Sequence, residues 1–315
     1  MIPLLDRRLL FVTGKGGVGK TSMAAAIGML AAEQGKRTLV CEVDAKGNLA
    51  DFLECEPVGF DPVEVASGLS VMAMDTEESL KEYLSLQLRV PLLARVGPLA
   101  KSFDFVATAA PGVKEILTVG KLCWEVRERS YDLVVVDAPA TGHVVAQLAA
   151  PQAINELVKV GRVREQTKWM VDILSDPAQT AAVIVAAPEE MPVTETLELA
   201  ERIRDETTVE LAAVVVNKVL PELFGRGEEE IFDRLGDDPH RSDLALAVGG
   251  PVDQVLDGAR LAVDLRRTRV QHLDRLRDEL PAGPLIVYVP YLFTRAHGLR
   301  ATRSVAESLG AELGY

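Results

Sequence analysis

The feature that most constrains the fold of this chain is a glycine-rich segment between an apolar run and a helix-forming run. The segment consists of Gly14, Lys15, Gly16, Gly17, Val18, Gly19, Lys20 and Thr21, and Ser22 follows it. It matches the phosphate-binding loop G-x-x-x-x-G-K-T, with a second lysine directly after the first glycine. The apolar run 9–13 predicts a buried strand, and the Ala-rich stretch 22–34 predicts a helix. This order of strand, loop and helix is the context in which the motif binds nucleotide phosphates.

The residue types of the loop suit a bound anion. Glycines permit positive φ angles and let backbone N–H groups point inward at the start of a helix. We expect Lys20 to reach the β- and γ-phosphates and the Thr21 hydroxyl to bind Mg²⁺. The alternative is a glycine-rich turn without a ligand, but all eight positions fit the motif and both flanking elements are suitable. The nine residues from Gly14 to Ser22 are therefore the predicted nucleotide-binding loop.

Short apolar runs alternate with helical stretches along the chain. This alternation predicts an α/β fold of the P-loop NTPase type, with a mostly parallel twisted sheet flanked by helices. The predicted strands are Leu9–Thr13, Thr38–Val43, Leu69–Met74, Asp132–Asp137, Ala182–Ala187, Ala212–Val216 and Leu285–Val289. Four of these runs are nearly uninterrupted, as expected of strands buried on both faces.

The predicted helices between these strands include Glu77–Leu88, Val113–Arg129, Pro151–Leu174, Val193–Asp205 and Ser242–Leu280. No internal repeat or low-complexity linker divides the chain, so we expect a single domain over residues 1–315. The interval 77–129 is too long for one crossover helix and predicts a helical insertion. The arginine-rich stretch 259–280 is interpreted as a solvated helix face rather than an anion-binding surface.

Composition limits the classes of partner. The 315 residues are 48% hydrophobic and 26% charged, which is typical of a soluble globular protein. No apolar run approaches the ~20 residues of a membrane-spanning helix, and the N-terminus lacks a signal-peptide pattern, so we expect a cytoplasmic protein without an integral membrane segment. The net charge of −13 argues against nucleic acid as a partner. The three cysteines are scattered without a C-x-x-C pair, which suits reduced thiols.

Polar residues follow three of the predicted strands, at the edge of the sheet where chemistry occurs in this fold class. Asp137 is well placed to hold Mg²⁺ through water, and Gly142 could offer a backbone N–H to the γ-phosphate. Asp44 could orient the attacking water, and the Asn217 amide matches one edge of adenine. Each residue alone could instead be a helix cap or turn former. His143 is interpreted as stabilising the segment after Asp137 rather than as a catalytic group.

These segments together resemble the ArsA/tail-anchored-protein-targeting family, also called anion-transporting ATPases, within the deviant-Walker group of P-loop ATPases. The loop GKGGVGKT carries the signature lysine of that group at Lys15. The segments DAKGNLAD at 44–51 and DAPATGH at 137–143 are similar to the two switch segments of the family. Residues 111–115, Asn217 and the segment beginning at Pro290 also fall where similar family segments lie. The resemblance covers nearly the whole chain.

The resemblance implies an ATPase that uses ATP and Mg²⁺. It implies catalytic roles for Asp44, Lys15 and Lys20, nucleotide contacts by Gly142, Asn217 and Pro290 besides the loop, and Mg²⁺ binding through Thr21 and Asp137. Lys15 is expected to reach the nucleotide of a partner subunit, in a homodimer or a heterodimer with a paralogue.

The chain also departs from the family pattern. Ala45 and Gly47 replace the proline and histidine of the first switch segment. The paired cysteines of tail-anchored targeting factors and the metalloid-binding cysteines of arsenite pumps are absent from the sequence. The methionine-rich insertion of the targeting factors is reduced to 151–174, in which Met170 is the single methionine.

The leading hypothesis is a Mg·ATP-dependent dimeric switch in which hydrolysis releases the two switch segments and acts on an unknown protein or small-molecule client. A targeting chaperone that binds hydrophobic or tail-anchored segments on residues 77–129 is an alternative, and the competing interpretation is that those leucines form internal core. A partitioning-type organising ATPase is a further alternative. It would require a membrane helix or a basic DNA-binding face.

Overall fold

The computed structural model describes residues 2–44, 48–88, 112–235, 237–293 and 298–315. At its centre lies a sheet of eight strands in the order β3-β4-β2-β5-β1-β6-β7-β8. All neighbouring strands are parallel except β3 and β4, which are antiparallel. The strands are β1 (Leu9–Gly14), β2 (Thr38–Glu42), β3 (Val63–Ala66), β4 (Leu69–Ala73), β5 (Leu133–Asp137), β6 (Thr180–Ala186), β7 (Glu210–Val219) and β8 (Leu285–Pro290). The α/β fold with a mostly parallel sheet is thereby confirmed.

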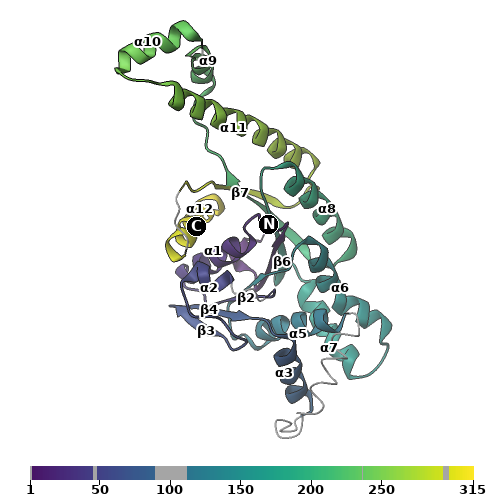
Figure 1. Ribbon diagram of the computed structural model, residues 1–315. Coiled ribbons are helices and arrows are strands. Elements are labelled where there is room, and N and C mark those ends of the chain that lie inside the picture. The colour runs from purple at the N-terminus through teal and green to yellow at the C-terminus, as the bar shows by residue number, and fades with distance from the viewer. Residues whose placement is uncertain (1, 45–47, 89–111, 236, 294–297) are drawn as a thin grey trace.

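Helices cover both faces of this sheet (Figure 1). They are α1 (Lys20–Glu33), α2 (Asn48–Leu53), α3 (Thr76–Leu88), α5 (Val113–Glu128), α6 (Thr141–Leu157), α7 (Arg162–Leu174), α8 (Glu190–Glu206), α9 (Arg226–Leu235), α10 (Asp238–Val248), α11 (Asp253–Glu279) and α12 (Leu299–Leu313). Within the described residues, none of these helices has the length and hydropathy needed to cross a bilayer.

The strand side chains divide the core into two layers. Leu9 and Phe11 of β1 point into the layer formed with α5, α6, α7 and α8. Leu10 and Val12 point into the layer formed with α1, α2 and α12. Because successive side chains of a strand alternate between faces, a strand covered on both sides is apolar at every position. This explains the uninterrupted valine runs, and all five residues of β5 are buried.

Two predicted helices are wrong in their extent. The stretch 151–174 contains the end of α6 and all of α7, which are separated by a break at 158–161 where Gly161 has a φ of 96°. The stretch 242–280 contains most of α10 and all of α11, separated by Gly249, Gly250 and Pro251. Gly249 ends α10 in the left-handed conformation with a φ of 73°, which is a common way for a helix to terminate. Strand β3 was not predicted, because it has only four residues and they are mostly exposed.

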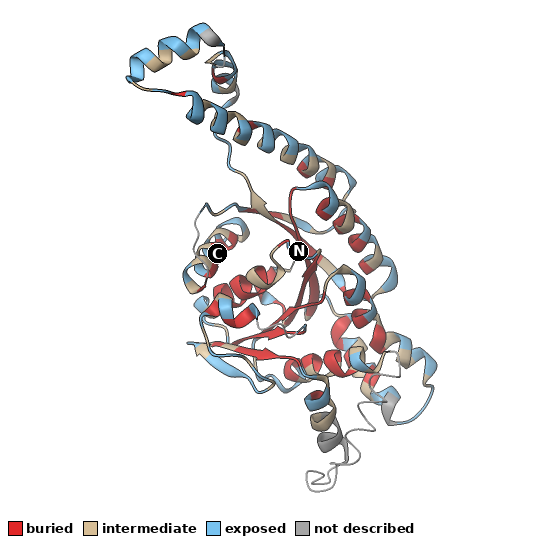
Figure 2. Cartoon of the chain, viewed as in Figure 1, coloured by how far each residue is buried: buried red, intermediate tan, exposed pale blue. Residues whose placement is uncertain are grey.

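A helical projection extends away from the sheet between β7 and β8 (Figure 1). The C-terminal part of α11 packs against the core through Leu273 and Leu276, while α9, α10 and the first turns of α11 lie beyond the sheet and are largely exposed (Figure 2). The predicted insertion at 77–129 contains α3 and α5, and its central part, including Leu92 and Leu93, lies outside the described residues.

Candidate functional site

The glycine-rich loop lies between β1 and α1, at the carboxyl edge of the sheet and flanked by β5 and β6. Gly14, Gly17 and Gly19 have φ angles of 144°, 86° and 101°, in the region that disfavours side chains. A Cβ atom on Gly14 would come within 2.2 Å of the Val185 carbonyl oxygen on β6. The tight fit and the backbone angles explain why this loop requires glycine at these positions. Helix α1 then begins at Lys20, so its N-terminal N–H groups lie at the loop.

Thr21 and Asp137 meet at the end of this loop. The Thr21 hydroxyl donates a hydrogen bond of 2.6 Å to one carboxylate oxygen of Asp137, the last residue of β5. Asp137 is buried, and within the described residues its other carboxylate oxygen has no hydrogen-bond partner. Burial raises the pKa of Asp137 to about 6, although the Thr21 hydrogen bond and the charge of Lys20 act in the opposite direction. A buried carboxylate with a vacant oxygen beside a hydroxyl is chemically suited to a Mg²⁺ ion and its bound water.

A second buried carboxylate, Glu42, was missed by the sequence analysis. Glu42 ends β2 and is the register partner of Asp137 on the neighbouring strand. One of its oxygens accepts a hydrogen bond of 3.2 Å from the Asn48 backbone N–H, and the other has no partner within the described residues. Its charge contributes to raising the Asp137 pKa. The signal in the sequence was an isolated acidic residue inside an apolar strand, a position where burial of a charge requires a reason.

The second lysine of the loop, Lys15, is held within its own chain. Its ammonium group forms an ion pair with Glu195 on α8, and both side chains are about one quarter exposed. The other carboxylate oxygen of Glu195 accepts a hydrogen bond of 3.4 Å from Thr141, the first residue of α6. Glu195 thus connects the phosphate loop with the segment that follows Asp137. No sequence pattern marked Glu195, because it lies 180 positions from Lys15.

Asn217 and Lys218, near the end of β7, form hydrogen bonds with backbone carbonyls of the glycine-rich loop. The Asn217 amide donates a hydrogen bond of 2.9 Å to the Val18 carbonyl, and its oxygen accepts one of 2.9 Å from the Lys218 backbone N–H. The Lys218 ammonium group donates to the Gly17 carbonyl at 2.9 Å. In this conformation both ends of the Asn217 amide are therefore engaged within the protein. Lys20 donates to the Lys15 carbonyl at 3.3 Å across the loop.

The remaining predicted site residues lie around this centre at different distances. Asp44 is exposed just after β2, and residues 45–47 of the first switch segment lie outside the described residues. Gly142 is exposed in the first turn of α6, and His143 beside it is also exposed. Pro290 ends β8, an edge strand separated from β1 by β6 and β7. The structure thus brings Lys15, Lys20, Thr21 and Asp137 together and leaves Pro290 at the margin.

The residues present fit a nucleotide and its metal ion. Three glycines shape a loop of backbone N–H groups at a helix N-terminus, where an anion is favoured. Thr21 and Asp137 would hold Mg²⁺, and the orphaned Asp137 oxygen supplies a direct reason for a cation or its water at that point.

Comparisons with known proteins agree with this geometry. The family model described as anion-transporting ATPase matches residues 7–167 and 155–230. The chain is 32% identical over 225 residues to ATPase BagA of Mycobacterium tuberculosis, a match that covers 68% of this chain and 66% of that protein. It is 28% identical to the arsenical pump-driving ATPases of Escherichia coli and Acidiphilium multivorum, over 67% and 68% of this chain but only 39% and 40% of theirs. The family match spans the phosphate loop, both switch segments and Asn217, and the chain therefore belongs to the anion-transporting ATPase family, in agreement with the resemblance inferred from its sequence.

Proposed function

We propose that this chain hydrolyses ATP to ADP and phosphate with Mg²⁺, and that it acts as a dimeric switch controlled by the nucleotide. The observation that carries the proposal is the contact of Thr21 with the buried, half-unpartnered carboxylate of Asp137 at the mouth of the glycine-rich loop. Such a site suits the phosphates of a nucleotide together with their metal ion better than any other ligand class.

The roles of the residues follow from their positions. The backbone N–H groups of the loop and the Lys20 ammonium group would bind the phosphates, and Thr21 and Asp137 would hold the metal. Mg²⁺, when bound, neutralises charge on the phosphate oxygens. Asp44 would accept a hydrogen bond from the attacking water and orient it in line with the bond that breaks. Gly142 at the start of α6 would offer a backbone N–H to the γ-phosphate.

The proposed dimer would require Lys15 to change its partner. In the isolated chain its ammonium group is neutralised by Glu195 and is directed away from the role that the family resemblance implies. We infer that a second subunit and its nucleotide compete with Glu195 for this lysine. Because Glu195 also accepts a hydrogen bond from Thr141, loss of the ion pair would loosen the start of α6, which is the second switch segment.

Calorimetric titration with Mg·ATP and a phosphate-release assay test this proposal together. Lys20→Ala should abolish nucleotide binding, whereas Lys15→Ala should retain binding and lose turnover. Turnover by Lys15→Ala equal to that of the unmodified chain would exclude a role for this lysine in hydrolysis. If the folded protein binds no Mg·ATP, alone or with a paralogue, the proposed function is wrong. If Mg·ATP is bound and hydrolysed, affinity purification of the Asp44→Asn variant in the presence of ATP would identify the client protein.

A second candidate function, the binding of hydrophobic protein segments, is favoured by one cavity. It has a volume of about 290 Å³ and is lined mainly by apolar side chains of α3, α5, α6 and α7, including Trp124, Trp169 and Met170. Photo-crosslinking of a labelled, apolar peptide of about 20 residues, the length of a membrane span, tests this function. Crosslinks to Trp124 or Met170 would support it, and crosslinks distributed evenly over the surface would exclude it.

A further inference from the structure

The helical projection between β7 and β8 carries an unusual surface. We define the distal arm as residues 222–265, which include α9, α10 and the N-terminal half of α11. Seven of the fifteen large hydrophobic side chains that are exposed among the described residues belong to it: Leu223, Ile231, Leu246, Val248, Val255, Leu261 and Leu265. Leu246 is 81% exposed, Val255 72% and Leu261 61%, so more than half of the surface of each residue is accessible to solvent. Clusters of exposed apolar side chains mark interaction surfaces more often than isolated ones do.

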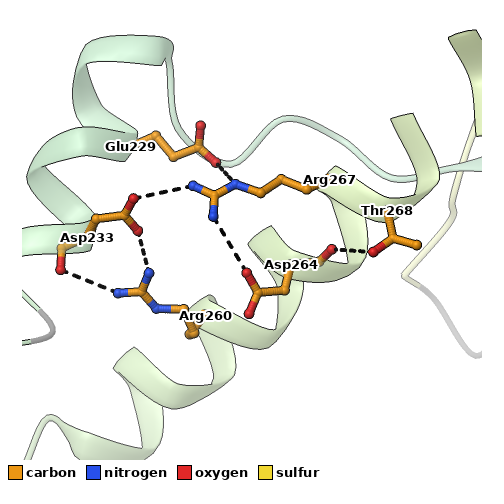
Figure 3. Close-up of polar contacts among 6 residues, drawn as sticks. All are labelled: Glu229, Asp233, Arg260, Asp264, Arg267 and Thr268. Carbon is orange, nitrogen blue, oxygen red and sulfur yellow. Dashed lines mark hydrogen bonds and ion pairs between the residues drawn. The ribbon is translucent and has the colours of Figure 1, made fainter. Parts of the chain in front are cut away.

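The arm is held in a defined shape by contacts that leave these side chains outside. Arg267 donates to Glu229 at 3.0 Å and contacts Asp233 at 3.3 Å, and Arg260 forms an ion pair with the same aspartate (Figure 3). These ion pairs connect α9 with α11. The Phe232 ring is buried, stacks on Phe224 with centroids 4.7 Å apart and lies under the Arg260 guanidinium. A surface that is already formed loses less conformational entropy when it binds a partner.

On α11 the exposed positions follow the register of helix packing. Gln254, Gly258, Leu261, Leu265 and Thr268 are all exposed, and they are spaced alternately by four and three residues. This spacing is the pattern with which one helix packs along another, with Leu261 and Leu265 at its centre. The small residues Gly258 and Thr268 on either side permit close approach of a second helix. The opposite face of α11 carries the buried Val263, which lines a cavity together with Leu223 and Phe224.

The charge of the arm is strongly negative. Residues 222–265 contain eleven Asp or Glu and four Arg, which gives a formal charge of −7, more than half of the −13 of the whole chain. Asp257 and Asp264 lie one position before Gly258 and Leu265 on α11, and both are exposed. Each also forms an ion pair within the chain, Asp257 with Arg241 and Asp264 with Arg267, so a basic partner would compete with these arginines. In helix pairs, these flanking positions determine the charge of the partner that is accepted.

We propose that the distal arm is a docking surface for a basic amphipathic helix of another protein. Leu261 and Leu265 would pack against the apolar stripe of that helix, and lysine or arginine residues beside the stripe would face the acidic side chains of the arm. A second copy of this chain is disfavoured, because two arms of charge −7 repel one another. An anionic membrane surface is disfavoured for the same reason. This inference does not depend on nucleotide binding.

The test uses the full chain and a synthetic probe. The probe is a fluorescent peptide of about 20 residues with leucines at heptad positions a and d and lysines beside them. Two control peptides have the same composition in a scrambled order, or glutamate in place of lysine. Fluorescence anisotropy should show saturable binding of the first peptide only, and the affinity should fall about tenfold or more between low and high salt.

Matched variants locate the binding. The double substitution Leu261→Ser and Leu265→Ser should weaken binding about tenfold or more, because two apolar contacts are lost. The double substitution Leu157→Ser and Val160→Ser removes side chains that are 81% and 82% exposed outside the arm, and it should leave binding unchanged. Circular-dichroism melting of both variants should match that of the unmodified chain, since all four side chains are exposed.

Several results would overturn the proposal. Equal binding of the scrambled peptide would show that net charge alone causes the binding. Equal weakening by both pairs of substitutions would show that the peptide does not bind at Leu261 and Leu265. Sedimentation that shows self-association of the chain, lost in the Leu261→Ser and Leu265→Ser variant, would identify the surface as an interface between copies. Flotation with anionic phosphatidylglycerol vesicles, lost in the same variant, would identify it as a lipid-binding surface.

Discussion

At the scale of single residues, the glycines of the phosphate loop differ in how well each would tolerate a side chain. Gly14 combines a φ of 144° with a backbone carbonyl that a Cβ would approach to 2.2 Å, whereas a Cβ on Gly16 would have no atom within 4 Å. We expect Gly14→Ala to reduce the free energy of unfolding by about 2–4 kcal/mol, because both strain and overlap must be relieved. Gly16→Ala should cost less than about 1 kcal/mol. Urea unfolding of both variants checks this difference, and equal midpoints would contradict it.

The titration of Asp137 provides a second residue-scale prediction, for the metal-free protein. Its pKa is raised by burial to about 6, so the folded protein binds this proton more tightly than the unfolded chain does. The protonated carboxyl group stabilises the fold below pH ~4, and this contribution is lost as the pH rises through ~6. Asp137→Asn should therefore raise the free energy of unfolding at pH 8 by up to about 3 kcal/mol in the presence of a chelator.

Asp132→Asn is the control for this prediction. The pKa of Asp132 is lowered by its hydrogen bonds with Arg37, so its charged form is the one that the fold favours. Removal of that charge should not stabilise the protein at pH 8. Stabilisation by Asp132→Asn equal to that by Asp137→Asn, or destabilisation by Asp137→Asn, would show that burial does not control the protonation of Asp137.

At the scale of elements, helix α12 is expected to contribute to the stability of the fold through its packing on α1. It packs against α1, and Leu309 is fully buried between the two helices. We expect Leu309→Ala to lower the free energy of unfolding by about 2–4 kcal/mol through the cavity that it leaves. Leu261→Ala in α11 removes the same atoms from a position that is 61% exposed, and should change stability by less than about 0.5 kcal/mol. Comparable losses would indicate that α11 is covered in solution.

The strands with the clearest sequence pattern are those buried on both faces of the sheet. Strands β1, β5 and β6 are buried on both faces, so their apolar runs leave one interpretation. The long helical predictions at 151–174 and 242–280 were wrong, because a helix pattern continues through a break when the residues on both sides remain amphipathic. Gly249, Gly250 and Pro251 marked one of these breaks, and Gly161 the other.

The site was predictable for the loop and for Asp137 at the end of β5, although Glu42 at the end of β2 was missed. Thr21 and Asp137 are 116 positions apart, yet the rule that parallel strands end at one edge brings them together. Glu195 could not be found in this way, since it lies within α8 rather than at a strand end, and its contact with Lys15 depends on the direction of that helix. Residues 259–280 were predicted to present a solvated helix face, but the projection of α9, α10 and the first turns of α11 from the sheet was not predicted.

At the scale of the whole molecule, the proposed dimerisation would have to compete with the ion pair between Lys15 and Glu195. If Lys15 must leave Glu195 to reach a partner's nucleotide, the free energy of that ion pair opposes dimer formation. For a pair about one quarter exposed this free energy is about 1 kcal/mol. A dimer of two identical subunits breaks two such pairs, so the total of about 2 kcal/mol corresponds to roughly a thirtyfold change in the dimerisation constant. Glu195→Gln should therefore shift ATP-dependent homodimerisation to a protein concentration roughly thirtyfold lower, as measured by sedimentation velocity. Glu198→Gln, an exposed position on the same helix, should leave the concentration unchanged. A Glu195→Gln protein that binds ATP normally and dimerises less readily would mean that Glu195 supports the closed dimer rather than opposing it.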